Sequence, residues 1–261
     1  MIRAAAVASV LALAAAPAVA EEVADLTAAS GIAGKTWIEL VRQALPGIAP
    51  GPNGGVVVRG KIKLRPIDKE PPPGGDCPDP VAIQALEVAR PRIANKERLI
   101  VGVAIDGDQC AAPLLLLEGD GQGKLLDAAN VKQDEHYFFP PDFVQPLGAG
   151  GQLVVVNGGH TKAGEGFETR ILVLATEAKL AYIGGVSAHN QGACQSETWE
   201  KPTIRTAPRP TGFAEVAAEV ESTVKRKGAD CVTPQGKDTV TTTRTLWRWI
   251  PAKRGYKQVS E

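Results

Sequence analysis

Leu114-Leu115-Leu116-Leu117 and Ile171-Leu172-Val173-Leu174 decide the fold of this chain. Each is a short apolar run, followed after a turn by a second short run, Lys124-Leu125-Leu126 in the first case and Lys179-Leu180-Ala181-Tyr182 in the second. Apolar runs of this length bounded by turn residues are typical of buried β-strands joined in hairpins. Because no helical crossovers separate the runs, we predict a mainly antiparallel β protein, either a sandwich or a partial propeller.

The same pattern covers most of residues 81–261, which we predict to form a β-rich domain. Further strands are predicted at 99–105, 152–156, 169–174 and 239–250. Residues 213–227 fit both a helical stripe and the alternation of a strand. We favour the strand, because it would form a hairpin with 239–250.

An N-terminal unit over residues 21–70 is predicted to hold one helix and one strand. Thr36-Trp37-Ile38-Glu39 matches a capping box, in which the Thr and Glu side chains satisfy exposed backbone N–H groups at a helix start. The helix should end at Pro46-Gly47, and a half-buried strand should follow over 56–65. Residues 71–80 are rich in Pro and Gly and predict a linker or a loop.

Residues 1–20 have the layout of a secretory signal peptide. Arg3 supplies a positive charge, residues 4–16 are uncharged and largely apolar, and Ala18-Val19-Ala20 offers small residues for cleavage. The apolar run is too short for a membrane span. We therefore expect an exported protein, periplasmic or secreted, and the Ala-rich leader indicates a bacterial source.

The charge balance argues against nucleic acid as a partner. Removing 20 of the 261 residues leaves 241, and with them goes one basic residue of 29, so 28 basic residues face 29 acidic ones. A net charge of −1 provides no general attraction to phosphates. No second long apolar segment follows the leader, so we expect no transmembrane segment after cleavage.

The four cysteines, Cys77, Cys110, Cys194 and Cys231, favour two disulfides, because an exported chain meets an oxidising compartment. Four cysteines allow three pairings. We favour Cys77–Cys110 and Cys194–Cys231, since each pair closes a local loop. A metal site is disfavoured by the absence of any C-x-x-C motif in the sequence.

Residues 157–166 are predicted to be a long loop between two strands and the best candidate site. The segment holds Asn157, His160, Lys162 and Glu165 among several glycines. Loops on rigid β scaffolds concentrate binding residues, and His160 with Glu165 could position a proton acceptor. His136 and His189 could join His160 as metal ligands. A flexible polar loop without a site is the alternative interpretation.

Trp247 and Trp249 are the second candidate feature, because their strand could offer an aromatic face to a sugar or peptide. The sequence has neither a G-x-S-x-G elbow nor a phosphate-binding G-x-x-x-x-G-K-[ST] motif, and it predicts no cofactor. We therefore expect a non-enzymatic module that binds a ligand or protein partner. The alternative is a periplasmic hydrolase, metal-assisted or not, that uses the 157–166 loop.

Overall fold

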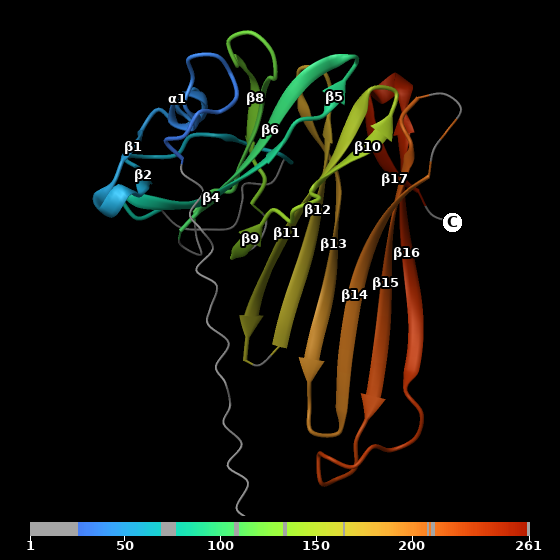
Figure 1. Cartoon of the computed structure of the whole chain (residues 1–261). Helices are drawn as coiled ribbons and strands as arrows, with labels where there is room; N and C mark the ends of the chain where they lie inside the picture. The colour runs from blue at the N-terminus through green and yellow to red at the C-terminus, as the bar shows by residue number, and fades with distance from the viewer. Residues whose placement is uncertain are drawn as a thin grey trace, which may run out of the picture.

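A computed structural model of the chain describes residues 26–68, 77–106, 110–132, 135–163, 165–207, 209 and 212–259. The leader predicted at 1–20 and residues 71–76 of the predicted linker lie outside this part of the chain. The described residues form two sheets with one α-helix, so the mainly β fold with an N-terminal helix is confirmed (Figure 1). No helix among them has the length and apolarity that a transmembrane span requires.

The first sheet has eight strands in the order β1-β2-β4-β6-β7-β8-β3, with β5 paired to β6. All of its pairs are antiparallel except β3 with β8. Its strands are β1 (Ile48–Pro50), β2 (Val56–Val58), β3 (Arg65–Pro66), β4 (Val81–Ala89), β5 (Arg92–Ile93), β6 (Lys96–Ile105), β7 (Pro113–Glu118) and β8 (Leu125–Asn130). Segments on both sides of the predicted linker thus share one sheet.

The second sheet has nine antiparallel strands in the order β10 to β17 along the chain, with β9 paired to β11. Its strands are β9 (His136–Phe138), β10 (Val144–Gly148), β11 (Gly151–Lys162), β12 (Glu165–Ala175), β13 (Leu180–Gly192), β14 (Ser196–Ala207), β15 (Glu215–Arg226), β16 (Thr239–Ile250) and β17 (Gly255–Val259). Short 3₁₀ turns lie at Pro52–Gly54 and Pro251–Lys253. The strand assignment favoured for 213–227 is confirmed by β15.

The helix α1 (Trp37–Arg42) begins with the predicted capping box. Thr36 Oγ1 accepts a hydrogen bond from Glu39 N, and Thr36 N donates to the Glu39 carboxylate. The carboxylate accepts further from the Thr36 side chain, and these hydrogen bonds hold the pKa of Glu39 below its usual value. The helix ends before the predicted Pro46-Gly47, and a turn carries Leu45 into the same core.

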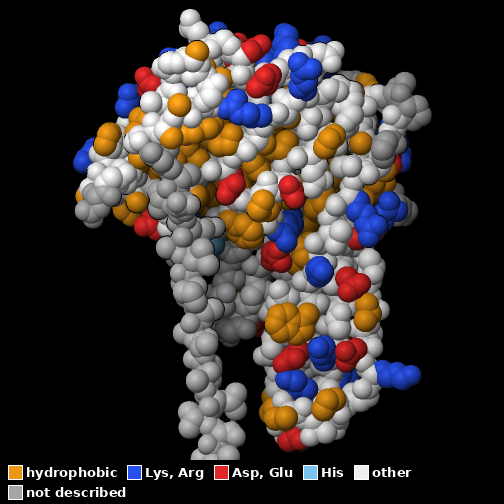
Figure 2. All heavy atoms as spheres, in the orientation of Figure 1, with side chains coloured by type: hydrophobic (Ala, Val, Ile, Leu, Met, Phe, Trp, Pro, Cys, Tyr) orange, Lys and Arg blue, Asp and Glu red, His pale blue; other side chains and the backbone are white. Residues whose placement is uncertain are grey.

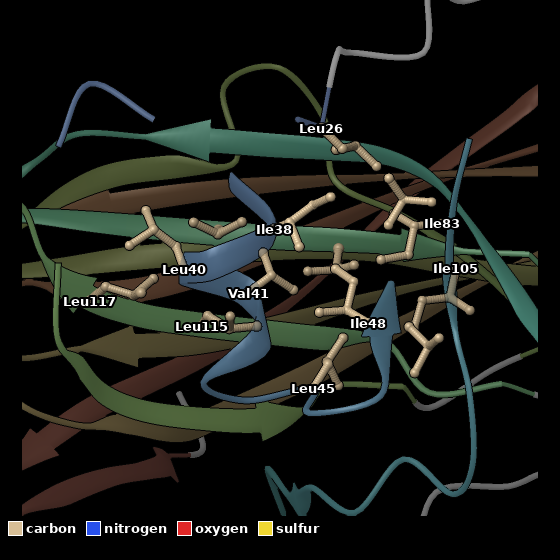
Figure 3. Close-up of a cluster of buried hydrophobic side chains, with 14 of the residues drawn as sticks. Leu26, Ile38, Leu40, Val41, Leu45, Ile48, Ile83, Ile105, Leu115 and Leu117 are labelled. Atoms are coloured by element: carbon tan, nitrogen blue, oxygen red, sulfur yellow. The ribbon is translucent and has the colours of Figure 1, made fainter. Parts of the chain in front are cut away.

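Three apolar cores separate four layers of the molecule. The first core lies between α1 and the first sheet, where Ile38, Leu40 and Val41 pack with β6 and β7 (Figure 3). The second core lies between the first sheet and β11–β13, and the third lies between β11–β13 and β14–β17. The sheets are therefore stacked as in a sandwich and do not form propeller blades.

The two-sided burial of the middle layers explains the uninterrupted apolar runs. Successive side chains of a strand point to opposite faces. In β7, Leu114 and Leu116 enter the second core while Leu115 and Leu117 enter the first. In β12, Ile171 and Val173 enter the second core while Leu172 and Leu174 enter the third. Both faces of these strands are covered, so every position is apolar.

The strand predicted at 56–65 is interrupted. β2 ends at Val58, and only Arg65–Pro66 pairs again, as β3. Gly60 has a φ of 74°, a left-handed conformation that glycine adopts readily and that breaks an extended strand. The alternation of apolar and basic residues between them therefore belongs to connecting chain.

The second sheet projects beyond the cores, and we name this part the distal half-sheet (Figure 1). Its residues lie in the ends of six strands: 159–162, 165–170, 185–192, 196–203, 219–226 and 239–245. Only Ala188 and Pro202 among these side chains are buried. On the face that Figure 2 shows, apolar side chains lie among Lys, Arg, Asp and Glu over the projecting part.

Candidate functional site

The segment 157–166 is the end of a regular hairpin, so its prediction as a long loop is wrong. β11 and β12 pair without a shift from Gln152↔Ala175 to Lys162↔Glu165. Glycines in this segment favour a loop in the sequence, yet Gly158 and Gly159 lie within the ladder. A Cβ on Gly159 would stand 2.4 Å from the Phe167 carbonyl oxygen, so glycine here serves the close approach of two strands.

The hairpin carries a stack of three rings across three strands. His160 pairs with Phe167, and Phe167 pairs with His189 on β13. The ring centroids of His160 and Phe167 are 4.5 Å apart, as are those of Phe167 and His189, with interplanar angles of 12° and 16°. Phe167 therefore separates the two imidazoles and keeps them from one shared ligand atom.

Glu165 contacts His189 rather than His160. Its Oε2 lies 3.3 Å from His189 Nε2, and its Oε1 accepts a hydrogen bond of 2.7 Å from Gln191 Nε2. Lys162 is the cross-strand partner of Glu165, so both lie on the face that carries the ring stack. Three predicted site residues, His160, Lys162 and Glu165, are thus brought to one face of the hairpin end.

Asn157 and His136 lie on the opposite face. His136 pairs with Gly159, which directly precedes His160, and consecutive strand residues face opposite sides. His136, His160 and His189 therefore do not converge, and the described residues hold no group of three or more metal-binding side chains. Asn157 is buried at 5% exposure, and its side-chain oxygen has no hydrogen-bond partner in the described part of the chain.

Of the predicted aromatic pair, Trp247 is buried in a core, whereas Trp249 packs against that core and is half-buried. Trp247 is 3% exposed and lies in the third core. Trp249 makes edge contacts with Phe213 and Tyr256, at centroid distances of 4.6 and 5.6 Å. Trp247 packs at Gly184, which is seven residues along β13 from Gln191 at the hairpin end, or roughly 23 Å of strand.

Trp199 is the exposed aromatic residue of the distal half-sheet. It pairs with Thr223, which pairs with Val240, so three side chains form one cross-strand row. Trp199 is 54% exposed and Val240 is 57% exposed. We name these three residues the Trp199 row.

Glu197 lies two residues before Trp199 on β14, so the two side chains share one face of the strand. Lys227 donates to the Glu197 carboxylate, and this bond is the main reason that the pKa of Glu197 lies below its usual value. A charged pair therefore borders the exposed indole.

A pocket among the described residues is lined by none of the predicted site residues, although its lining residue Gly212 lies beside Trp249. It has a volume of about 310 Å³ and lies between the β10–β11 turn, the end of β14 and the start of β15. Arg209 at its edge is ion-paired with Glu215, which Arg248 also contacts at 2.5 Å. Arg248 is the main cause of the lowered pKa of the Glu215 carboxyl.

Cys194 and Cys231 form the predicted disulfide, which joins the β13–β14 turn to the β15–β16 connection. Cys77 and Cys110 are free thiols in the structure, and Cys77 is close enough to influence the pKa of Cys110. The second disulfide stays a prediction. Cys110 is 1% exposed, and burial followed by the Cys77 contact raises the pKa of its thiol to about 12.

We expect the Cys110 thiol to resist alkylation in the folded protein. A pKa of about 12 against an ordinary value near 9 lowers its thiolate fraction at pH 8 about a thousand-fold. The unfolded chain binds fewer protons between these two values, so this thiol also makes stability fall as pH rises from about 9 to 12. The measurement is peptide mapping after iodoacetamide treatment of protein made in a reducing cytoplasm, with a urea-unfolded control. Equal labelling of Cys110 in both samples would contradict the expectation.

The sequence pattern does not identify Phe167, Trp199 or any part of β14. Phe167 stands alone in a polar stretch, and only the register of the hairpin places it between two histidines. Residues 196–207 contain no apolar run, and their strand character rests on pairing with the predicted strand 213–227. The one sequence signal for this strand is the turn around Cys194, from which the second strand of a hairpin would extend.

Known proteins provide no further guidance to this site. No protein-family model matches the chain, and neither a curated protein nor a solved structure is similar to it. The function therefore has to be argued from the residues themselves.

Proposed function

We propose that the protein is an exported, non-enzymatic binding protein that presents its distal half-sheet to a macromolecular partner. The observation that carries this proposal is the projection of six paired strands beyond all three cores, with only two buried side chains among them. Such a sheet adds little to the apolar cores that stabilise the fold. It does provide a broad, ordered surface.

The Trp199 row is the proposed centre of that surface. Tryptophan is enriched among the residues that dominate binding energy at protein interfaces. Single exposed apolar residues are ordinary, but here Trp199 and Val240 lie in one row on either side of Thr223.

Export is proposed from the leader-like residues 1–20, whose charge and apolar pattern is that of a signal peptide. The Cys194–Cys231 disulfide supports this part of the proposal, because disulfides persist in oxidising compartments. A periplasmic or secreted location is compatible with both features.

A hydrolase is the second candidate, and the Glu165–His189 contact is the observation that favours it. A carboxylate beside an imidazole can orient that ring as a proton acceptor. The two side chains are 35% and 37% exposed, however, on the open end of a hairpin. Enzyme sites usually enclose their substrates in a concave pocket, so the binding function is the better supported one.

Replacing Trp199 with alanine is expected to weaken binding to the partner about 30-fold, the effect of losing about 2 kcal/mol at an interface centre. The measurement is co-sedimentation of the purified mature protein with cell envelopes of the organism that encodes it. Phe138→Ala is the matched control, because Phe138 is also 54% exposed but lies on β9.

Three results discriminate between the proposals. Binding that is lost in Trp199→Ala, kept in Phe138→Ala and abolished by protease treatment of the envelopes supports a protein partner. Absence of binding, or equal losses in both variants, contradicts the proposed surface. Turnover of an ester or amide substrate that His189→Ala abolishes would instead favour the hydrolase.

A further inference from the structure

The outer edge of β16 is open along its distal part. β17 pairs with residues Leu246–Ile250 of β16 and leaves the preceding residues uncovered. Among the described residues, no strand pairs with Thr239–Thr243 on the side away from β15. All five residues are exposed, and β16 lies at the outer side of the projecting sheet in Figure 1.

The register identifies which backbone groups point outward. Lys227 N donates to Gln195 O, continuing the β14–β15 register, so odd-numbered residues of β15 bond toward β14. Even-numbered residues of β15 therefore bond toward β16, where their partners are odd-numbered. The N–H and C=O groups of Val240 and Thr242 thus point away from the sheet.

This edge lacks the features by which proteins block edge pairing. Natural edges carry lysines, prolines, bulges or a covering segment. Residues 239–243 read Thr-Val-Thr-Thr-Thr, which contains none of these residues and has high β propensity. The β15–β16 ladder also runs without a register shift from Val224↔Thr239 to Val216↔Trp247. The edge is straight, regular and able to accept another strand.

We propose that two copies of the chain pair antiparallel through their β16 edges. A second copy brings an identical open edge, and a two-fold axis makes such an interface self-complementary. With the axis at Thr242, threonines lie opposite threonines, and Val240 lies opposite Arg244 of the other copy. Cross-strand threonine pairs are favourable in antiparallel sheets.

The charges of the flanking residues are compatible with this pairing. The Arg244 guanidinium is ion-paired with Glu219 of its own chain at 3.9 Å, so its aliphatic stem is what lies beside Val240 of the other copy. The Glu221 residues of the two copies are separated by both β16 strands, roughly 14 Å. No like charges become neighbours in this register.

The dimer joins two distal half-sheets into one continuous sheet. A two-fold axis perpendicular to the sheet keeps the same face of both copies on one side, so both Trp199 rows are presented together. If the proposed function is right, this arrangement makes the binding surface bivalent. The pairing itself does not depend on that function.

Sedimentation velocity of the mature protein from about 1 to 100 μM tests the pairing, a range suited to a small interface. We expect the sedimentation coefficient to rise toward that of a dimer. Thr242→Lys should raise the dissociation constant at least about tenfold, because it places two ammonium groups opposite each other. Thr203→Lys is the matched control, since Thr203 is also exposed but lies on β14, two strands away from the proposed edge.

Hydrogen exchange of the Val240 and Thr242 amides provides the second readout. Both amides should be protected at dimer concentrations in the wild type and in Thr203→Lys, and unprotected in Thr242→Lys. Equal melting temperatures of the two variants will show that Thr242→Lys is folded. A wild type that stays monomeric overturns the proposal, as does a Thr242→Lys variant that dimerises normally. Edge protection that appears only with added cell envelopes would identify a foreign strand and also overturn it, whereas loss of envelope binding alone would affect only the proposed function.

Discussion

Gly184→Val is expected to lower the free energy of unfolding by about 4 kcal/mol, the cost of displacing a buried tryptophan from a core. A Cβ on Gly184 would stand 2.2 Å from Trp247 Nε1 and 2.4 Å from its Cε2. Trp247 is 3% exposed and lies in the third core, between β11–β13 and β14–β17. The valine and the indole cannot occupy this space together, so one of the two layers has to move.

Thermal unfolding of the two valine variants of β13 measures this effect. For a chain of this size, 4 kcal/mol corresponds to a melting temperature roughly 8–16 °C lower. Gly192→Val is the matched control, because a Cβ on Gly192 would have no atom within 4 Å. The control should melt within about 2 °C of the wild type, as surface substitutions usually do. Equal losses in the two variants would contradict the packing of Trp247 against β13.

Removing the Cys194–Cys231 disulfide by the double substitution Cys194→Ser and Cys231→Ser is expected to cost about 4 kcal/mol. The two residues are separated by 37 positions, and closing a loop of that length removes this much chain entropy from the unfolded state. The bond ties the turn between β13 and β14 to the connection between β15 and β16. Its loss should therefore weaken the distal half-sheet first.

Chemical denaturation with and without a reducing agent separates the disulfide from other effects of the substitutions. In protein whose Cys77 and Cys110 are free thiols, as in the structure, reduction should destabilise the wild type by the same amount as the double substitution and should leave the double variant unchanged. A Cys77→Ser variant should keep the sensitivity of the wild type, because Cys77 is not part of this bond. A double variant as stable as the oxidised wild type would show that the bond contributes no stability.

The strands of the middle layers could be predicted from the sequence, because a strand that is buried on both faces consists of an uninterrupted apolar run. Leu114–Leu117 and Ile171–Leu174 are such runs, and each is a strand between two cores. Among the described residues no layer covers the distal half-sheet, so most of its strands lack an uninterrupted apolar run. For this reason the sequence pattern does not predict a strand at 196–207 and predicts a loop at 157–166.

The candidate site was predicted only in part, because cross-strand neighbours are set by register. His160, Lys162 and Glu165 were identified, and they do share a face. The sequence pattern linked His160 to Glu165, whereas the carboxylate contacts His189 from a third strand. Trp247 and Trp249 were predicted as site residues from their residue type alone. They lie at the end of β16 that is buried or half-buried, whereas the other end is exposed, and residue type does not reveal this difference.

The apolar composition of the middle layers raises the question of what prevents their strands from slipping by one residue. A slip usually exchanges polar and apolar faces and is therefore strongly disfavoured. In β6, β7, β11 and β12 it would move one apolar residue into the place of another, so polarity discriminates weakly. Size does discriminate, because glycines lie beneath large rings. A Cβ on Gly102 would stand 2.5 Å from the Phe139 ring, and one on Gly151 would stand 2.5 Å from the Phe213 ring. A slip of β6 would place Val101 or Val103 beneath the Phe139 ring, and a slip of β11 in one direction would place Gln152 beneath the Phe213 ring. These pairs of a glycine and an aromatic ring therefore help to fix the alignment of the layers.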